Sequence, residues 1–410
     1  MPEVQTLSIN LYGDPVGTLT LLSGDRSIFA FNDAYIADPA RPTLSLSYKD
    51  EFGGLITQSR PTQTSLTPFF SNMLPEGHMR DYLAARAGVK EVREFHLLWA
   101  LGADLPGAVT VTSPNDAIWQ DPATKLGEEV SAEQAKSAVM RFSLAGVQMK
   151  FSAIAEAQGG LTIPVNGAGG SWIVKLPSRR FERVPENEFS MMHIAERIGI
   201  EVPDNKLIDP KDVLGLPEGV SALSEPAFAI KRFDRGGDGA RVHIEDFAQV
   251  FNVRPKAKYE DASYWMIARV LWIEAGAPAV EDFVRRLVYN TLIGNADMHL
   301  KNWSLIYRDR RSPTLAPAYD YVSTIAYLQD ELAALKYARQ KRMLALSYDE
   351  LAYLAARAGV SETLVVRTAR ETVARFVESW DAEKAHLPMT DAMVKTIENH
   401  YQKSAMFMSA

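Results

Sequence analysis

Alternating apolar and polar positions fill the first part of the chain, in short runs separated by turn residues. Three runs have the length and composition of β-strands: residues 4–11, 17–22 and 27–31. Two later runs have the spacing of helices: residues 79–87 and 91–101. The pattern therefore predicts an N-terminal α+β domain over residues 1–112.

The pattern changes twice farther along the chain. Residues 113–130 are polar and contain proline, asparagine and glycine, which predicts a linker because these residues favour turns. Strand-like runs and glycine-rich turns follow, and a helix with one apolar face is expected at 186–199. We therefore expect a β-rich lobe over residues 131–250 and a helical lobe over residues 251–410, in an α+β fold.

The composition is that of a folded globular protein. The chain has 410 residues, of which 47% are hydrophobic and 23% charged, and this length predicts two or three domains or lobes. No apolar run approaches the roughly 20 residues of a membrane span, and the N-terminus does not read as a signal peptide. A cytoplasmic protein without membrane contacts is expected. The lack of cysteine excludes disulfides, thiolate zinc sites and cysteine nucleophiles.

The charge balance limits the kinds of partner. With 44 basic and 51 acidic residues the formal net charge is -7, which argues against a chain that coats nucleic acid unaided. A local basic patch remains compatible with this charge. The seven histidines include no close pair at metal-ligand spacing, which argues against a histidine zinc site.

One polar loop carries the strongest chemical signal. In LIGNADMHLKN (292–302), Asp297 and Asn302 have the D-x-x-x-x-N spacing of the protein-kinase catalytic loop. A carboxylate there can accept the proton of an attacking hydroxyl, while the amide oxygen holds a magnesium ion. Lys301 could stabilise negative charge on the transferred phosphoryl group. Alone, this spacing is also typical of turn formers and caps in a polar loop after a helix.

Three further residues complete a possible phosphate and metal site. Asp320 in AYDYVS (318–323) follows another apolar run and could bind the same metal, although a solvated turn residue is the alternative. Lys175 lies within the apolar strand WIVKLP, where burial would require an anionic partner. Glu188 in the next helix could form that ion pair. The alternatives are an edge-strand lysine that reaches water, and Glu186 as the partner.

A turn at 141–150, with Gly146 among small residues, could cradle phosphates through its backbone N–H groups. It does not have the Walker pattern, and an ordinary β-turn is the alternative.

An ordered series of segments resembles the HipA-type toxin kinases of bacterial toxin-antitoxin systems. The segments are SLAGVQMK (143–150), WIVKLP (172–177), ENEFSMMHIAERIGIEVP (186–203), AFAIKRFDR (227–235), HIEDFAQVFNV (243–253), KYE (258–260), LIGNADMHLKN (292–302) and AYDYVS (318–323). The resemblance covers roughly residues 140–380, and the N-terminal domain looks like the smaller domain that precedes the kinase in this family. It implies a two-lobed protein-kinase-like fold and an ATP- and Mg²⁺-dependent serine/threonine kinase.

The resemblance also implies roles for individual residues. Asp297 would be the catalytic base, with Lys301 beside it, and Asn302 and Asp320 would hold magnesium. The positions that would contact ATP are Ala145, Gly146, Val147, Lys175, Lys231, Phe233, Gln249 and His299. Ser143 matches the autophosphorylated serine of the family, whose modification ejects the phosphate loop. Two added negative charges would repel ATP phosphates there, which makes this inactivation physically reasonable.

Partners follow from the same resemblance. The substrate would be a serine in a protein, which in the best-known member is glutamyl-tRNA synthetase, so that growth stops. A HipB-type antitoxin would supply most of the DNA contacts. Met149 and Lys231 depart from the well-known member, which leaves the loop conformation and the substrate open.

Two alternatives stay open. The first is a small-molecule kinase of the same fold, although the SLAGVQ and KRFDR segments do not belong to that class. The second is a catalytically silent subunit that represses transcription together with an antitoxin.

Overall fold

The computed structural model describes most of the chain: residues 6–113, 150–155, 161–162, 170–178, 180–216, 225–236, 239–328 and 331–409. The predicted linker beyond Ser113 lies outside these residues. The same holds for Ser143 and for the predicted phosphate-contacting residues Ala145, Gly146 and Val147.

The N-terminal domain is built on an antiparallel sheet of five strands, ordered β4-β3-β2-β1-β5. Its strands are β1 (Thr6–Leu11), β2 (Asp14–Leu22), β3 (Arg26–Phe31), β4 (Thr62–Gln63) and β5 (Val109–Thr112). Its helices are α1 (Asp33–Ala37), α2 (Pro68–Met73), α3 (Gly77–Arg86) and α4 (Glu94–Leu101). Phe29, Phe69 and Phe70 pack edge to face in a core that is separate from the rest of the chain.

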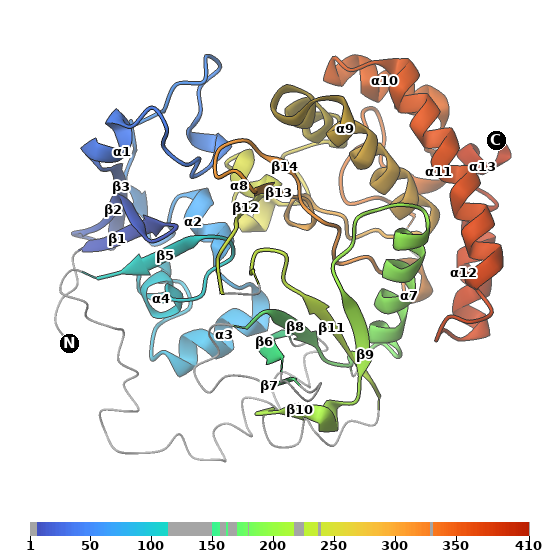
Figure 1. The fold of residues 1–410 in the computed structure, drawn as a ribbon, viewed down its shortest axis with the longest axis horizontal. Coiled ribbons are helices and arrows are strands. Elements are labelled where there is room, and N and C mark those ends of the chain that lie inside the picture. The colour runs from blue at the N-terminus through green and yellow to red at the C-terminus, as the bar shows by residue number, and fades with distance from the viewer. Residues whose placement is uncertain are drawn as a thin grey trace.

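The central sheet has six strands in the order β10-β7-β6-β8-β11-β9. These are β6 (Lys150–Ala155), β7 (Leu161–Thr162), β8 (Trp172–Lys175), β9 (Asn205–Ile208), β10 (Val213–Leu214) and β11 (Ala227–Lys231). Helix α7 (Val184–Arg197) packs against it because Met191, Ile194 and Ala195 recur at helical spacing and are fully buried. In Figure 1 this green sheet lies between the blue N-terminal domain and the helices of the C-terminal part.

The C-terminal part combines a small sheet with helices. The strands, ordered β12-β13-β14, are β12 (His243–Asp246), β13 (Ser304–Tyr307) and β14 (Thr314–Leu315). The helices are α8 (Phe247–Val250), α9 (Tyr264–Leu292), α10 (Tyr348–Ala358), α11 (Glu362–Glu383), α12 (Asp391–Tyr401) and α13 (Ala405–Met408). Helix α9 is interrupted at Gly276, whose φ of 75° is outside the helical range.

Short 3₁₀ turns connect these elements: η1 (Leu46–Tyr48), η3 (Pro210–Asp212), η4 (Pro255–Ala257), η5 (Leu300–Asn302), η6 (Thr324–Ala326) and η7 (Met343–Ala345). One large apolar core joins α7 to α9, α10 and α11 and ends close to η5. Strand β12 pairs with β13, so the segment before α8 lies beside the strand that follows the predicted catalytic loop.

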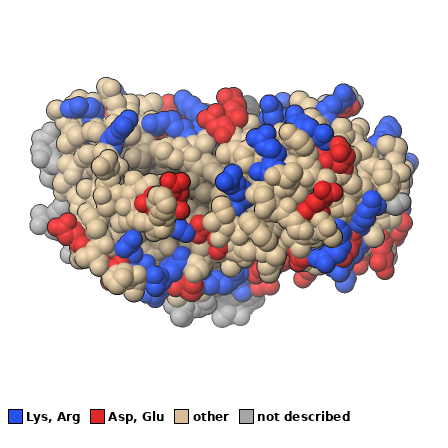
Figure 2. All heavy atoms as spheres, turned by 90° about the horizontal axis from the view of Figure 1, so that it is seen from above, with Lys and Arg blue, Asp and Glu red and all other residues tan. Residues whose placement is uncertain are grey.

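The α+β class expected from the sequence is confirmed by this arrangement. Basic and acidic side chains are interspersed on the face shown in Figure 2. Within the described part of the chain, no helix combines the length and the apolar character needed to cross a membrane.

Candidate functional site

Lys175, Glu188 and Asp320 meet in a buried ion cluster. The Lys175 ammonium contacts the carboxylates of both Glu188 and Asp320. Lys150, which lies directly opposite Lys175 on the neighbouring strand, places its Nζ 3.2 Å from Asp320 Oδ2. Lys175 is 4% exposed and Glu188 is 1% exposed, so the cluster is closed to water except near Asp320 and Lys150.

The cluster holds its charges in place. Burial alone would lower the pKa of Lys175, but the carboxylates of Asp320 and Glu188 outweigh burial and raise it. Burial would raise the pKa of Asp320, yet Lys150 and Lys175 hold it far below its usual range. For Glu188 burial dominates, and its pKa is raised despite Lys175. Asp320 is therefore an anion at any physiological pH.

Helix α7 and the segment after β14 are tied together beside this cluster. The Asn187 side chain donates to the Ser323 carbonyl at 3.1 Å and accepts from the Ser323 N–H at 2.9 Å. Asp320 itself has a φ of 58°, a left-handed conformation that aspartate tolerates better than most residues. The backbone thus turns the Asp320 carboxylate toward Lys175.

The predicted catalytic loop lies next to Asp320. Asn295 donates to the Asp320 carbonyl at 3.4 Å, and the Thr324 hydroxyl bridges the Ala296 N–H and the Gly294 carbonyl. Gly294 ends helix α9 with a φ of 67°. These contacts bring the Asp297–Asn302 loop and Asp320 to the same place, although about 20 residues separate them in sequence.

Asp297 projects from the loop with its side chain exposed. The Tyr259 hydroxyl donates to Asp297 Oδ1 at 2.6 Å, and burial together with the Asp297 charge raises the pKa of Tyr259. The Asn302 amide donates to the Asp297 carbonyl at 2.8 Å, which closes the loop. A carboxylate fixed in this way can accept a proton from a nearby hydroxyl group.

His299 and Lys301 occupy different positions within the loop. His299 is buried against Tyr259, its Nδ1 accepts from the Lys301 N–H, and burial lowers its pKa to about 4. The Lys301 ammonium is directed to the N-terminal domain, where it donates to Glu76 Oε1 at 2.6 Å. His299 is therefore a neutral side chain beside Asp297, and Lys301 is part of a domain contact.

Three of the predicted nucleotide contacts lie on other elements. Lys231 ends β11 and pairs with Asp204 at 2.9 Å, and the ring of Phe233 lies 5.7 Å from that of Tyr319. Gln249 caps α8 and donates to the Phe69 carbonyl at 2.9 Å, which connects α8 to the N-terminal domain. Both polar ends of the Gln249 amide are thus engaged within the fold.

The donor set suits magnesium. Among the residues that the structure describes, no three His, Cys, Asp or Glu side chains form a metal-binding group. Magnesium usually binds one or two protein oxygens and takes its remaining ligands from water and phosphates. The ionised Asp320 and the Asn302 amide fit this preference.

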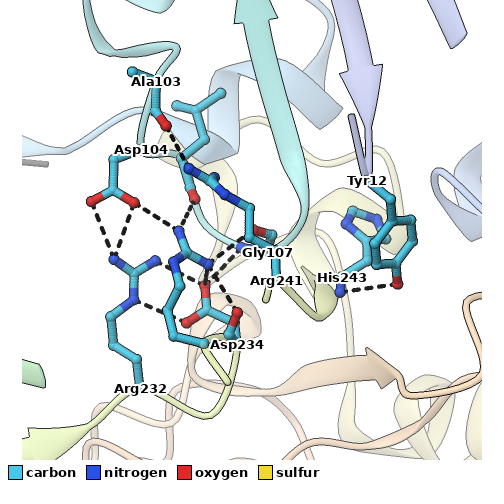
Figure 3. Close-up of polar contacts among 10 residues, drawn as sticks. Tyr12, Ala103, Asp104, Gly107, Arg232, Asp234, Arg241 and His243 are labelled. Carbon is cyan, nitrogen blue, oxygen red and sulfur yellow. Dashed lines mark hydrogen bonds and ion pairs between the residues drawn. The ribbon is translucent and has the colours of Figure 1, made fainter. Parts of the chain in front are cut away.

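An ion cluster that sequence reasoning missed joins the N-terminal domain to the segment after β11 (Figure 3). Asp104 accepts from Arg235 at 2.8 Å and from Arg232 at 3.4 Å. Asp234 bridges Arg232 and Arg235 and accepts the Gly107 N–H at 2.8 Å. The alternating charges of KRFDR directly after a buried strand were the available signal, because charges at such a place need partners.

A second link lies beside this cluster, where the Tyr12 hydroxyl accepts the His243 N–H at 3.2 Å (Figure 3). Tyr12 also donates to the Tyr307 carbonyl at 3.1 Å. The two links connect the N-terminal domain with the segment directly after β11 and with the first residue of β12.

Comparison with known proteins agrees with this architecture. Residues 142–380 match the HipA-like C-terminal domain, and residues 7–112 match the HipA N-terminal domain. A protein of Sinorhizobium fredii, provisionally named kinase Y4dM, is 58% identical over 98% of this chain and 97% of its own length. The serine/threonine-protein kinase toxin HipA of Shewanella oneidensis is 26% identical over 80% of this chain and 77% of its own.

A solved structure shows the same fold. The Shewanella oneidensis HipA, determined in complex with HipB and operator DNA, superposes with a TM-score of 0.73 at 20% identity. The match covers 97% of this chain and 96% of that one, which confirms the two-lobed kinase-like fold expected from the sequence. The chain belongs to the HipA family of kinases and contains both of its domains.

Proposed function

We propose that this protein is an ATP- and Mg²⁺-dependent serine/threonine protein kinase. One observation carries the proposal: the buried Lys175–Glu188–Asp320 cluster lies beside a loop that presents the exposed carboxylate of Asp297. A buried lysine paired with a helix glutamate, a metal-binding aspartate and a catalytic-loop aspartate are the parts that phosphoryl transfer requires.

The proposed chemistry assigns each part a task. Asp297 accepts the proton of a serine or threonine hydroxyl while that oxygen attacks the γ-phosphorus of ATP. The bond from the γ-phosphorus to the bridging oxygen breaks, and ADP leaves with the electron pair. Asp320 and Asn302 would hold the Mg²⁺ ion, and the ion when bound would neutralise charge on the phosphates. The Lys175 ammonium contacts the α- and β-phosphates and remains paired with Glu188.

The remaining predicted contacts surround this centre. Residues 229–233 would serve as the hinge against the adenine; Lys231 is the last residue of β11, and Phe233 follows two residues later. His299 stays neutral because of burial and can donate a hydrogen bond without adding charge. The predicted phosphate loop and Ser143 lie outside the described residues, so their roles remain predictions from the sequence.

We further propose that the kinase is the toxin of a toxin-antitoxin module. The named toxin among its relatives and the HipA–HipB–DNA complex of the Shewanella protein support this proposal. A HipB-type antitoxin would then be the partner and would supply most of the DNA contacts. The substrate would be a translation-related protein such as an aminoacyl-tRNA synthetase, and phosphorylation of Ser143 would inactivate the kinase.

The decisive experiment compares the wild type with Asp297→Gln. Each purified protein is incubated with ATP and Mg²⁺ in a lysate of its host, and phosphopeptides are identified by mass spectrometry. We expect phosphate on Ser143 and on one lysate protein with the wild type only, and growth arrest when the wild type is produced without antitoxin. Glu378→Gln, an exposed change on α11, is the matched control and should behave as the wild type.

Four outcomes would contradict parts of the proposal. Equal labelling by Asp297→Gln would remove Asp297 from the role of base. Labelling of small molecules without any protein would favour a small-molecule kinase. Absence of labelling with both proteins would favour the silent co-repressor subunit, and harmless overproduction of active kinase would remove the toxin assignment.

A further inference from the structure

Glu76 of the N-terminal domain contacts two lysines of the helical lobe. It lies directly before α3, and its two carboxylate oxygens are 2.6 Å from Lys301 Nζ and 2.7 Å from Lys258 Nζ. The Lys301 ammonium also donates to the Asn72 carbonyl at 3.0 Å. One carboxylate therefore connects the first domain to two separate segments of the lobe that carries Asp297.

Both segments belong to the immediate support of the catalytic loop. Lys258 precedes Tyr259, whose hydroxyl holds Asp297, and the Lys258 carbonyl accepts the Leu300 N–H at 3.3 Å. Lys301 precedes Asn302, whose amide closes the loop on the Asp297 carbonyl. Glu76 thus restrains the polypeptide on both sides of Asp297.

The electrostatics agree with a firm contact. Burial would raise the pKa of Glu76, but Lys301 and Lys258 together lower it to about 2. The side chains of Lys301 and Lys258 are only 16% and 18% exposed, so water screens the contact less than at an open surface. The Glu76 carboxylate therefore stays ionised at physiological pH, in contact with both lysines.

The surrounding contacts fix the part of the N-terminal domain that carries Glu76. Asn72 on α2 donates to the Val253 carbonyl at 2.8 Å, and Gln249 donates to the Phe69 carbonyl at 2.9 Å. Helix α2 is thereby attached to α8 and to the segment that leads to Lys258. Glu76 lies in the short segment between α2 and α3, next to this attached helix.

We propose that Glu76 is a positioning residue, through which docking of the N-terminal domain sets the position of the catalytic loop by way of Lys301 and Lys258. This inference rests on the proposed function, because the loop matters only if Asp297 acts in phosphoryl transfer. It also assigns Lys301 a positioning task in place of a direct contact with the reacting atoms.

The test compares Glu76→Gln with the wild type in the full-length protein. The rate of phosphate incorporation from γ-labelled ATP into the protein itself is measured as a function of ATP concentration. We expect the maximal rate to fall by about tenfold to a hundredfold, since a displacement of about 1 Å at the reacting groups has this effect. The ATP concentration at half-maximal rate should change less than about twofold, because Lys175 and Asp320 are untouched.

Two further variants separate positioning from a general loss of structure. Glu51→Gln changes an exposed glutamate of the same domain and should retain the wild-type rate. Glu76→Gln combined with Lys301→Met should be no slower than Glu76→Gln alone, because residues that act through one contact are not additive. A further loss in the double variant would place Lys301 at the reacting atoms and overturn the inference.

Hydrogen exchange gives a result that does not depend on activity. We expect faster amide exchange in residues 294–302 of Glu76→Gln than in the wild type, whereas the exchange of α11 stays the same. Unchanged exchange in that segment, or an unchanged maximal rate in an active enzyme, would overturn the role of Glu76. If the wild type transfers no phosphate, the proposed function fails, and the exchange result alone decides on Glu76.

Discussion

Replacement of Lys175 by methionine tests the buried ion cluster directly. The change keeps the apolar stem of the side chain and removes the cation that contacts Glu188 and Asp320. Asp320 retains Lys150 at 3.2 Å and a side-chain exposure of 24%, so it can be solvated. Glu188, at 1% exposure, loses the cation that touches it and becomes the costly group.

The magnitude follows from this asymmetry. Removal of one partner from a buried ion pair lowers the free energy of unfolding by about 3–5 kcal/mol. Because Asp320 keeps Lys150 and contact with water, we expect Lys175→Met near the lower end of this range, at about 3 kcal/mol. For a domain of this size that corresponds to a fall in Tm of roughly 6–12 °C. Phosphoryl transfer should be lost as well, because the variant lacks the ammonium group proposed to contact the α- and β-phosphates.

The loss should depend on pH with a definite sign. Burial already raises the pKa of Glu188, and removal of Lys175 raises it further. A carboxyl whose pKa is raised in the folded state stabilises the protein below its unfolded pKa, and this contribution is lost as pH rises through the folded pKa. The difference in Tm between wild type and variant should therefore be larger at pH 8 than at pH 5.

The assay is thermal unfolding of both proteins by circular dichroism across this pH range. Lys175→Met combined with Glu188→Leu is the companion variant, because it also removes the buried anion and should recover most of the stability. A variant that melts within about 2 °C of the wild type at pH 8 would refute the reasoning. So would a double variant that melts no higher than Lys175→Met.

Two further predictions concern groups that support the site. Burial raises the pKa of Glu245 to about 7, so its contribution to stability should be lost as pH rises through 7. From pH 4 to 8 the free energy of unfolding in urea should fall by on the order of 3 kcal/mol more in the wild type than in Glu245→Gln, which keeps the raised pKa of Asp246. Parallel profiles would contradict this origin. Gly294→Ala places a methyl group against Ile325 at a φ of 67° and should lower the free energy of unfolding by about 2 kcal/mol or more. Gly359→Ala has a similar φ of 74° but open space around the new methyl group, so it should lower the free energy of unfolding by about half as much. Equal losses of stability would mean that the clash with Ile325 adds nothing.

Local spacing was enough to locate the polar loop, the strand and the helix that carry the candidate site. The D-x-x-x-x-N spacing located the loop of Asp297 and Asn302, and the apolar run around Lys175 showed that a charge would be buried. The helix expected at 186–199 is present as α7, with its apolar face on the core. These features depend on neighbours within a few residues, so the sequence carries them directly.

The partners of the charged residues depend on long-range packing instead. The choice between Glu186 and Glu188 for Lys175 was open in the sequence, and the rotation of α7 against the sheet places Glu188 inward. In the sequence, the KRFDR segment contributed only to the family resemblance. The fold shows Arg232 and Arg235 paired both with the nearby Asp234 and with Asp104, which is more than 100 residues away in the sequence.

The same division applies to Lys301, which the sequence predicts to take part in the chemistry of the loop. The sequence shows that Lys301 lies beside Asn302 in this loop, but the direction of its long side chain depends on the Glu76 carboxylate of the N-terminal domain. The sequence by itself determined which elements form and which polar residues they carry, because helical and strand periodicity and turn residues act over a few positions. Only the tertiary structure decided which charges meet, because Glu76 and Lys301 are 225 residues apart and come together only when the two domains pack.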